Sequence, residues 1–256
     1  DQPRSRGLGD VYKRQVKKAY YRQSIARKEE VVSFLRQKNY HNLADNPHIT
    51  VYTGIGSFAG PDVVEVGMVE GTLQLQAPRI FINTGAETVI PPIKGLSEIA
   101  YWTSKEALDV KELPRSIAII GGGVIGIEFA SFFNSMGVKV KVIEMMPEIL
   151  GAMDKEISAM LRSEYTKKDV EFFLETKVIE VTPDSVIVEK DGKTETIEAD
   201  KILVSVGRKA NTKNLGIETL GIELLRNGIK VNEYMQTSHP NVYACGDITG
   251  FSMLAH

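Results

Sequence analysis

The sequence predicts an α/β fold with a doubly wound parallel β-sheet and an antiparallel β insertion. Residues 116–120 (SIAII) form a continuous apolar run, which is typical of a parallel strand that is buried on both faces. Beyond this run, strand-like and helix-like segments alternate along the chain, as they do in doubly wound sheets. A set of short β-like runs interrupts the alternation, so we expect an antiparallel meander as an insertion in the domain.

The N-terminal part is expected to contain a helix followed by a small antiparallel sheet. Residues 1–15 are basic and lack a hydrophobic period, so we expect an irregular segment there, either a disordered terminus or a stretch that is not native. Residues 16–38 have a helical period. Short β-like runs bounded by glycine and proline follow at 49–52, 63–66, 72–76 and 79–83.

The central part begins with the strand at 116–120, and a glycine turn then leads into an apolar helix. Asp154 is placed to cap a later helix. The expected elements are helices 124–136 and 155–168, strands 138–144, 170–174 and 201–206, meander strands 178–181, 185–189 and 194–197, and tail strands 229–231 and 242–245. Residues 49–85 and 178–207 share the order meander, strand and a residue pair ending in glycine, which indicates two related domains.

The bulk composition excludes several classes of protein. Of 256 residues, 43% are hydrophobic and 25% are charged, and the net charge is −2, so nothing indicates binding to nucleic acid or to a membrane surface. No apolar run approaches the roughly 20 residues that a membrane span needs. Because Cys245 is the only cysteine and the 4 histidines fit no ligand spacing, we expect no metal site, no intrachain disulfide and a reducing, cytoplasmic compartment.

The glycine turn after residue 120 carries the strongest functional signal. Gly121, Gly123 and Gly126 have the G-x-G-x-x-G spacing between an expected strand and an expected helix. The first glycine allows a tight turn, the second lets a diphosphate approach the backbone, and the third lets the helix pack close to the strand. Backbone N–H groups around Val124 and Ile125 would donate to the phosphates. The alternative is a glycine-rich turn without a ligand.

Three acidic residues stand where a nucleotide could meet them. Glu144 ends the next strand, where a carboxylate can accept hydrogen bonds from a ribose and repel a 2′-phosphate. Because residues 145–147 supply no arginine, we expect NAD in preference to NADP. Glu128 lies on the first turns of the helix, and Asp247 follows the last expected strand. Each has an ordinary alternative. Glu144 could be a surface residue at a strand end, Glu128 a solvent-facing helix residue, and Asp247 the cap of a turn.

Together, these segments resemble the pyridine nucleotide-disulphide oxidoreductases, and within that family the dihydrolipoamide dehydrogenases most closely. The resemblance covers about residues 16–256 and rests on segments in the family's order: Asn83–Ala86 (NTGA), Gly121–Glu128 (GGGVIGIE), Glu144, Val206–Asn211 (VGRKAN), Tyr243–Asp247 (YACGD) and Met253–His256 (MLAH). It implies a Rossmann-like NAD-binding domain with a meander insertion, itself inserted into a partial FAD-binding domain of the same type.

The resemblance also implies a role for individual residues. On the NAD side, Gly121, Gly123, Val124, Ile125 and Gly126 would hold the pyrophosphate, Glu144 the adenosine ribose and Glu128 the nicotinamide end, and Gly207 would lie against the nucleotide. On the FAD side, Thr84 and Gly85 would pack by the cofactor, Asp247 would bind the ribityl chain, and the backbone of Leu254 and Ala255 would face the flavin.

By the same resemblance, residues 16–95 would be a partial FAD-binding domain, 96–115 a linker, 116–233 the NAD-binding domain and 234–256 a return to the FAD-binding domain. The family's first glycine-rich β-α-β unit, its redox pair of cysteines and its C-terminal dimerisation domain with a His-Glu acid/base pair have no counterpart here. We therefore expect a fragment of a homodimeric parent, with no catalytic residue in this chain.

The expected function of the parent is electron transfer through FAD to NAD from a dithiol, either a small molecule or a lipoyl-protein. Val124, where some relatives carry a tyrosine, favours the dihydrolipoamide type, whereas residues 27–45 and 80–92 look more like the mercuric-reductase and reactive-chlorine-resistance branch. Further alternatives are an NADH oxidase or peroxidase, a ferredoxin or rubredoxin reductase, and, for this chain alone, a nucleotide-binding module without turnover.

Overall fold

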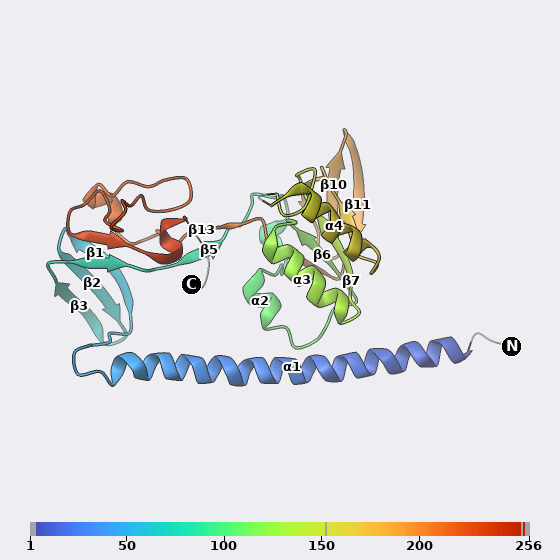
Figure 1. The fold of residues 1–256 in the computed structure, drawn as a ribbon, viewed down its shortest axis with the longest axis horizontal. Helices are drawn as coiled ribbons and strands as arrows, with labels where there is room; N and C mark the ends of the chain where they lie inside the picture. The colour runs from blue at the N-terminus through green and yellow to red at the C-terminus, as the bar shows by residue number, and fades with distance from the viewer. Residues whose placement is uncertain (1–3, 152, 252, 254–256) are drawn as a thin grey trace. The chain divides into compact units, whose positions relative to one another are not determined.

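The polypeptide forms two compact units, and each unit is built from two separate segments of the chain (Figure 1). The computed structural model describes residues 4–151, 153–251 and 253, with the backbone alone for residues 4–15 and 18. Unit 1 comprises Asp1–Phe34 and Thr88–Gly207, and unit 2 comprises Leu35–Glu87 and Arg208–His256. The mixed α/β fold that the sequence predicts is confirmed. The chain passes from unit 1 to unit 2 after Gly207.

A four-stranded parallel sheet with the order β12-β6-β7-β8 forms the middle of unit 1. Its strands are β6 (Ser116–Ile120), β7 (Lys139–Ile143), β8 (Glu171–Phe173) and β12 (Lys201–Val204). Each strand lies within a run that the sequence predicts to be a strand. Ile117 and Ile119 are 0% exposed, because this sheet is covered on both faces as its continuous apolar runs indicate.

Two helices connect the parallel strands as predicted. α3 (Val124–Ser135) links β6 to β7 and buries Phe129 and Phe133, and α4 (Lys155–Thr166) links β7 to β8. Asp154 caps α4, since its Oδ1 accepts hydrogen bonds from the N–H groups of Glu156 at 2.9 Å and Ile157 at 3.3 Å. This β-α-β-α-β order is the Rossmann-like arrangement that the sequence predicts.

The opposite face of the sheet is covered by an antiparallel meander. It consists of β9 (Lys177–Val181), β10 (Ser185–Lys190) and β11 (Lys193–Glu198). Alternate residues of β6 face the two sides: Ala118 and Ile120 pack in one core cluster with the meander residue Val186, whereas Ile117 and Ile119 pack in the cluster of α3. Unit 1 also contains η1 (Leu96–Glu98) and α2 (Ser104–Leu108).

Unit 2 contains a second meander and short paired strands. The meander is β1 (Ile55–Gly60), β2 (Val63–Met68) and β3 (Gly71–Gln76); the other elements are β4 (Ile80–Ile82), β5 (Ala86–Thr88), β13 (Arg208–Ala210), η2 (Ile217–Leu220), β14 (Val242–Ala244) and η3 (Gly246–Thr249). β4 pairs in parallel with β14, and β5 pairs with β13. The core of this unit gathers Ile82, Ile217 and Val242.

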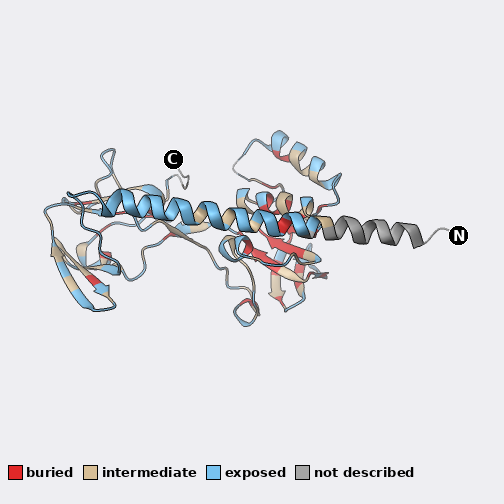
Figure 2. Cartoon of the chain, turned by 90° about the horizontal axis from the view of Figure 1, so that it is seen from below, coloured by how far each residue is buried: buried red, intermediate tan, exposed pale blue. Residues whose placement is uncertain are grey.

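The first helix, α1 (Arg4–Ala44), departs from the sequence-based expectations at both ends. Residues 4–15 are helical, so the irregular segment expected there is wrong for these residues. The helix also continues past residue 38, because the next proline is Pro47. Within its described side chains, Tyr21 alone is buried, and Figure 2 shows the rest of this part as exposed or half-buried. The Tyr21 hydroxyl donates to the Val110 carbonyl at 2.6 Å.

Two expected strands are not formed. Residues 49–52 lie outside any strand, and the meander begins instead at β1, whose glycines resemble a turn in the sequence. The glycine just before it, Gly54, is required by close packing, since a Cβ there would lie 2.6 Å from the carbonyl oxygen of Gly67. Residues 229–231 form no strand, and Ile229 makes only an isolated bridge to Leu224.

Candidate functional site

The strongest candidate site lies at the carboxyl edge of the unit 1 sheet. Because β6, β7 and β12 are parallel, the residues that follow them emerge at the same edge: Gly121 after β6, Glu144 after β7 and Ser205 after β12. The chain winds from β6 through β7 to β8 and then returns to β12 on the other side of β6. The carboxyl ends of β6 and β12 therefore form a topological switch point, the place where open α/β sheets bind their ligands.

The first and third glycines of the turn are required by the packing of the protein itself. Gly121 has φ 107°, and a Cβ at this position would lie 2.6 Å from the carbonyl oxygen of Ser205. A Cβ at Gly126 would overlap the carbonyl oxygen of Gly121 and lie 2.8 Å from the Ser205 Oγ. These two positions therefore fulfil the roles in turn geometry and helix packing that the spacing predicts.

The second glycine is not required by any such contact. Gly123 has φ −73° and ψ −178°, which any residue can adopt. Apart from its chain neighbours, no residue that the structure describes lies within 4 Å of a Cβ placed on it. It is the N-cap of α3 and makes no side-chain capping bond. The Ile127 N–H is the first to donate back to the Gly123 carbonyl, at 3.0 Å, so the N–H groups of Val124 and Ile125 precede the intrahelical ladder. The site thus combines open space with helix-start donors.

Glu144 turns its carboxylate toward the glycine turn. Its Oε2 accepts a hydrogen bond from the Gly122 N–H at 2.6 Å, and its Oε1 accepts one from the Met146 N–H at 2.9 Å. The side chain is half-buried. The structure therefore brings the acidic residue and the glycine turn together, as the sequence predicts, and holds the carboxylate in one orientation.

The segment after Glu144 forms a wall beside the turn. The Leu150 N–H donates to the Gly122 carbonyl at 2.9 Å, and Ile149 is fully buried. Glu148 anchors this wall to α4, since it accepts hydrogen bonds from Arg162 Nε at 2.8 Å and Nη2 at 3.0 Å. The hydrogen bonds from Arg162 are the main cause that holds the pKa of the Glu148 carboxyl below its usual value.

Two further residues that the resemblance assigns to NAD are exposed. Glu128 lies on α3 and lines an apolar groove of about 470 Å³ between α3 and α4. The Glu128 side chain is exposed, so its burial does not indicate a role in ligand binding. Gly207 follows β12 at the carboxyl edge, has φ 129° and is exposed, and its carbonyl accepts the Val89 N–H at 3.0 Å.

The residues assigned to FAD gather at one edge of unit 2. Thr84 and Gly85 follow β4, and Asp247 follows β14; because these strands are parallel, all three emerge at the same end. The Thr84 Oγ1 donates to the Asn211 carbonyl at 2.9 Å, and the Asn211 N–H donates to the Gly85 carbonyl at 2.9 Å. Asp247 is half-buried in η3. The expected contacts of residues 254 and 255 lie outside the described residues.

Sequence reasoning missed Ser205, which the structure places directly against the turn. It is 7% exposed, and its Oγ donates to the Gly121 carbonyl at 3.0 Å. The only signal in the sequence is a polar residue within the apolar run of residues 202–206 (ILVSV). Such a residue becomes informative only once the strand order shows that β12 lies next to β6.

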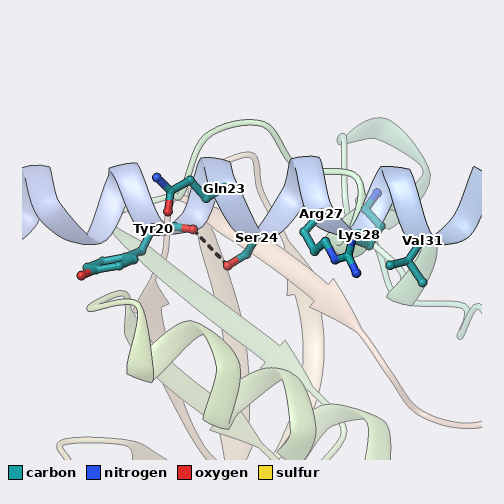
Figure 3. A pocket seen from close by; sticks show the side chains of 6 residues that line it. All are labelled: Tyr20, Gln23, Ser24, Arg27, Lys28 and Val31. Carbon is teal, nitrogen blue, oxygen red and sulfur yellow. Dashed lines mark hydrogen bonds between the residues drawn. The ribbon is translucent and has the colours of Figure 1, made fainter.

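A separate hollow lies along the surface of α1, and Figure 3 shows the side chains that line it. All of them come from this one helix: Tyr20, Gln23, Ser24, Arg27, Lys28 and Val31. The Ser24 Oγ bonds within the helix, to the Tyr20 carbonyl at 3.0 Å. A hollow with a single wall offers no groups that converge on a ligand from several elements, so the glycine turn is the stronger candidate.

In the part of the chain that the structure describes, no three or more side chains of His, Cys, Asp and Glu gather in a way that could hold a metal ion. Likewise, none of the helices described has the length and apolar character of a membrane span.

Comparison with known proteins decides the family. The sequence pattern of the pyridine nucleotide-disulphide oxidoreductases matches residues 8–256. The chain belongs to this family. Within it, a dihydrolipoyl dehydrogenase from Acholeplasma laidlawii is 44% identical over 237 residues, which cover 91% of this chain and 68% of the relative.

A second relative in the family has a known structure. The probable pyridine nucleotide-disulfide oxidoreductase RclA from Escherichia coli (strain K12) is 37% identical over 229 residues, which cover 89% of this chain and 52% of RclA. The copper(II) complex of the HOCl-induced flavoprotein disulfide reductase RclA from this species superposes with a TM-score of 0.86 at 35% identity, over 91% of this chain and 54% of that one. The chain thus spans only about half the length of this family member.

Proposed function

We propose that unit 1 binds NAD at the carboxyl edge of its sheet, as the nucleotide-binding part of a FAD- and NAD-dependent oxidoreductase. The observation that carries this proposal is the open space at Gly123, because none of the described residues packs against this position in a way that requires a glycine. A diphosphate would fit against this position and accept hydrogen bonds from the N–H groups of Val124 and Ile125. The positive end of the α3 dipole would add to its binding.

The orientation of Glu144 supports NAD in preference to NADP. Each carboxylate oxygen accepts one backbone N–H, from Gly122 or Met146, and keeps a lone pair for the hydroxyl groups of a ribose. A 2′-phosphate would instead meet this negative charge. Residues 145–147 (Met-Met-Pro) offer no cation that could compensate it.

We infer that unit 2 supplies part of a FAD site, through Thr84, Gly85 and Asp247 at the ends of β4 and β14. In this family setting, FAD would supply the electron transfer between a dithiol and NAD, while the protein supplies binding and orientation. Glu128 and Gly207 would lie toward the nicotinamide half of the bound NAD.

For the substrate of the parent we propose a dithiol of the dihydrolipoamide type, either free or as a lipoyl group on a protein. The 44% identity to a dihydrolipoyl dehydrogenase supports this choice. A second candidate is a reductase of the RclA type, which the TM-score of 0.86 favours. Since the chain has 1 cysteine, we infer that alone it binds nucleotide without dithiol turnover, which requires a second thiol.

Isothermal titration of the 256-residue chain with NAD⁺ and NADP⁺ tests the proposal. We expect NAD⁺ to bind more tightly by about tenfold or more, and the Glu144→Gln variant to reduce this ratio because the negative charge is removed. A lack of NAD⁺ binding would contradict the proposed function. Equal affinities of the wild-type chain for both nucleotides would contradict the role of Glu144.

A further inference from the structure

We propose that Ser205 is a positioning residue for diphosphate binding, and that it and Glu144 hold the Gly121–Gly122 peptide group from its two ends. The inference rests on the proposed NAD-binding function and extends it to a residue that would not touch the nucleotide. Its basis is that two side chains from different strands bond to one peptide group of the turn.

That peptide group joins the carbonyl of Gly121 to the N–H of Gly122. The carbonyl accepts a hydrogen bond from the Ser205 Oγ at 3.0 Å. The N–H donates to the Glu144 Oε2 at 2.6 Å. Ser205 follows β12 and Glu144 follows β7, and these strands lie on opposite sides of β6 in the sheet. The turn that leaves β6 is therefore held from both neighbouring strands.

The Ser205 hydroxyl has a specific partner in this arrangement. The side chain is 7% exposed, and a buried hydroxyl that lacks a partner is costly. The Ile120 carbonyl lies 3.2 Å from the Ser205 Oγ, but it already accepts the Ser205 backbone N–H at 2.8 Å. The Gly121 carbonyl is nearer, so we assign the hydroxyl proton to it. The hydroxyl thus fixes the carbonyl end of the peptide group.

Fixing both ends of a peptide group prevents it from rotating, because a rotation would break both hydrogen bonds together. The direction of this group sets that of the next N–H groups, at Gly123, Val124 and Ile125. Donors that are already oriented lose less conformational freedom when a ligand binds. Removing the Ser205 hydroxyl should therefore weaken ligands that carry the diphosphate, whereas a ligand without phosphate should bind as before.

The test compares Ser205→Ala with the wild-type chain, using ADP-ribose and adenosine as probes. Calorimetry measures ADP-ribose binding, and ligand-observed NMR measures the weaker binding of adenosine. We expect the Kd of ADP-ribose to rise by about three- to tenfold, the usual effect of one hydrogen bond. The Kd of adenosine should stay unchanged. Should Ser205→Ala fail to fold, Ser205→Cys gives the same comparison, since a thiol is only a weak donor.

Thr237→Val is the matched control. It removes another buried hydroxyl, which donates to the Val242 carbonyl at 2.9 Å in unit 2. It should lower the melting temperature but leave both Kd values unchanged. An unchanged Kd of ADP-ribose in Ser205→Ala, an equal loss for adenosine, or an equal loss in Thr237→Val would overturn the positioning role alone. A wild-type chain that binds neither probe would overturn the proposed function and this inference together.

Discussion

Three glycines with one spacing serve two different purposes in the turn. Gly121 and Gly126 are surrounded by main-chain atoms of the protein, so a side chain at either position would disturb the fold. Gly123 faces open space and has an ordinary backbone conformation. The open space at Gly123 leaves room for a ligand to approach the backbone.

We therefore expect Gly123→Ala to weaken nucleotide binding with little effect on folding. None of the described residues beyond its chain neighbours lies within 4 Å of the added Cβ. Alanine restricts the unfolded chain more than glycine but is a poorer N-cap, and these two effects oppose each other, so we expect the free energy of unfolding to change by less than about 1 kcal/mol. NAD⁺ should bind more weakly by about tenfold or more, because the methyl group would lie where the diphosphate approaches. Denaturant unfolding and calorimetric titration measure the two effects.

Gly126→Ala is its matched control. The added Cβ would overlap the Gly121 carbonyl, and overpacking of this kind costs about 1–3 kcal/mol in the free energy of unfolding. A Gly123→Ala variant that binds NAD⁺ like the wild type, or that unfolds as easily as Gly126→Ala, would contradict the distinction between the two glycines.

At the scale of elements, the wall beside the turn depends on a two-point ion pair between the β7–α4 segment and α4. The Glu148 side chain is 17% exposed and that of Arg162 is 34% exposed, so solvent screens this pair less than it screens a surface pair. The pKa of Glu148 is lowered mainly by the hydrogen bonds from Arg162. The contribution of this ion pair to the free energy of unfolding must therefore depend on pH.

We expect Arg162→Met to lower the free energy of unfolding near neutral pH by about 1–2 kcal/mol, because paired charged hydrogen bonds are lost. A carboxyl whose pKa is lower in the folded than in the unfolded state stabilises the fold above its unfolded pKa. This stabilisation is lost as the pH falls through the folded pKa. The difference between the wild type and Arg162→Met should thus shrink in acid, as urea unfolding at a series of pH values would measure.

An exposed ion pair at the C-terminal end of α4, between Lys167 and Glu164, provides the control. Its side chains are 66% and 60% exposed, respectively. Lys167→Met should leave the stability unchanged at each pH. A difference between the wild type and Arg162→Met that stays constant into acid would show that the ion pair is not its source.

Long periodic elements could be predicted from the sequence, and short or exposed ones could not. The strand β6 and the helices α3 and α4 begin at predicted residues, because apolar runs, a glycine turn and the Asp154 cap mark their starts. The two ends of α1, residues 4–15 and 39–44, were not predicted because the helical period of residues 16–38 does not extend into them. The short strands β5 and β13 depend on pairing across the sequence, which no local pattern reveals.

At the scale of the whole molecule, the sequence could predict the parts of the site that are consecutive but not those that meet through topology. The glycine turn and Glu144 belong to one β-α-β unit, so their proximity follows from the unit itself. Ser205 reaches the turn only because β12 returns beside β6 after the meander.

A prediction for the whole chain follows from its single cysteine, Cys245. We expect no formation of NADH from dihydrolipoamide and NAD⁺, even with added FAD, because the exchange of a dithiol needs two protein thiols. The absorbance of NADH in a steady-state assay measures this. Turnover above that of a Cys245→Ser variant would show that the chain carries a redox site which this account lacks.

Titration of the 256-residue chain with NAD⁺, followed residue by residue through amide NMR signals, tests the location of the nucleotide site most directly. We predict the largest shifts at the N–H groups of Gly123, Val124 and Ile125, with a smaller shift at Gly122. In Gly123→Ala these shifts should need NAD⁺ concentrations that are higher by about tenfold or more. Shifts confined to other parts of the chain, or no shifts at high NAD⁺ concentration, would contradict the account.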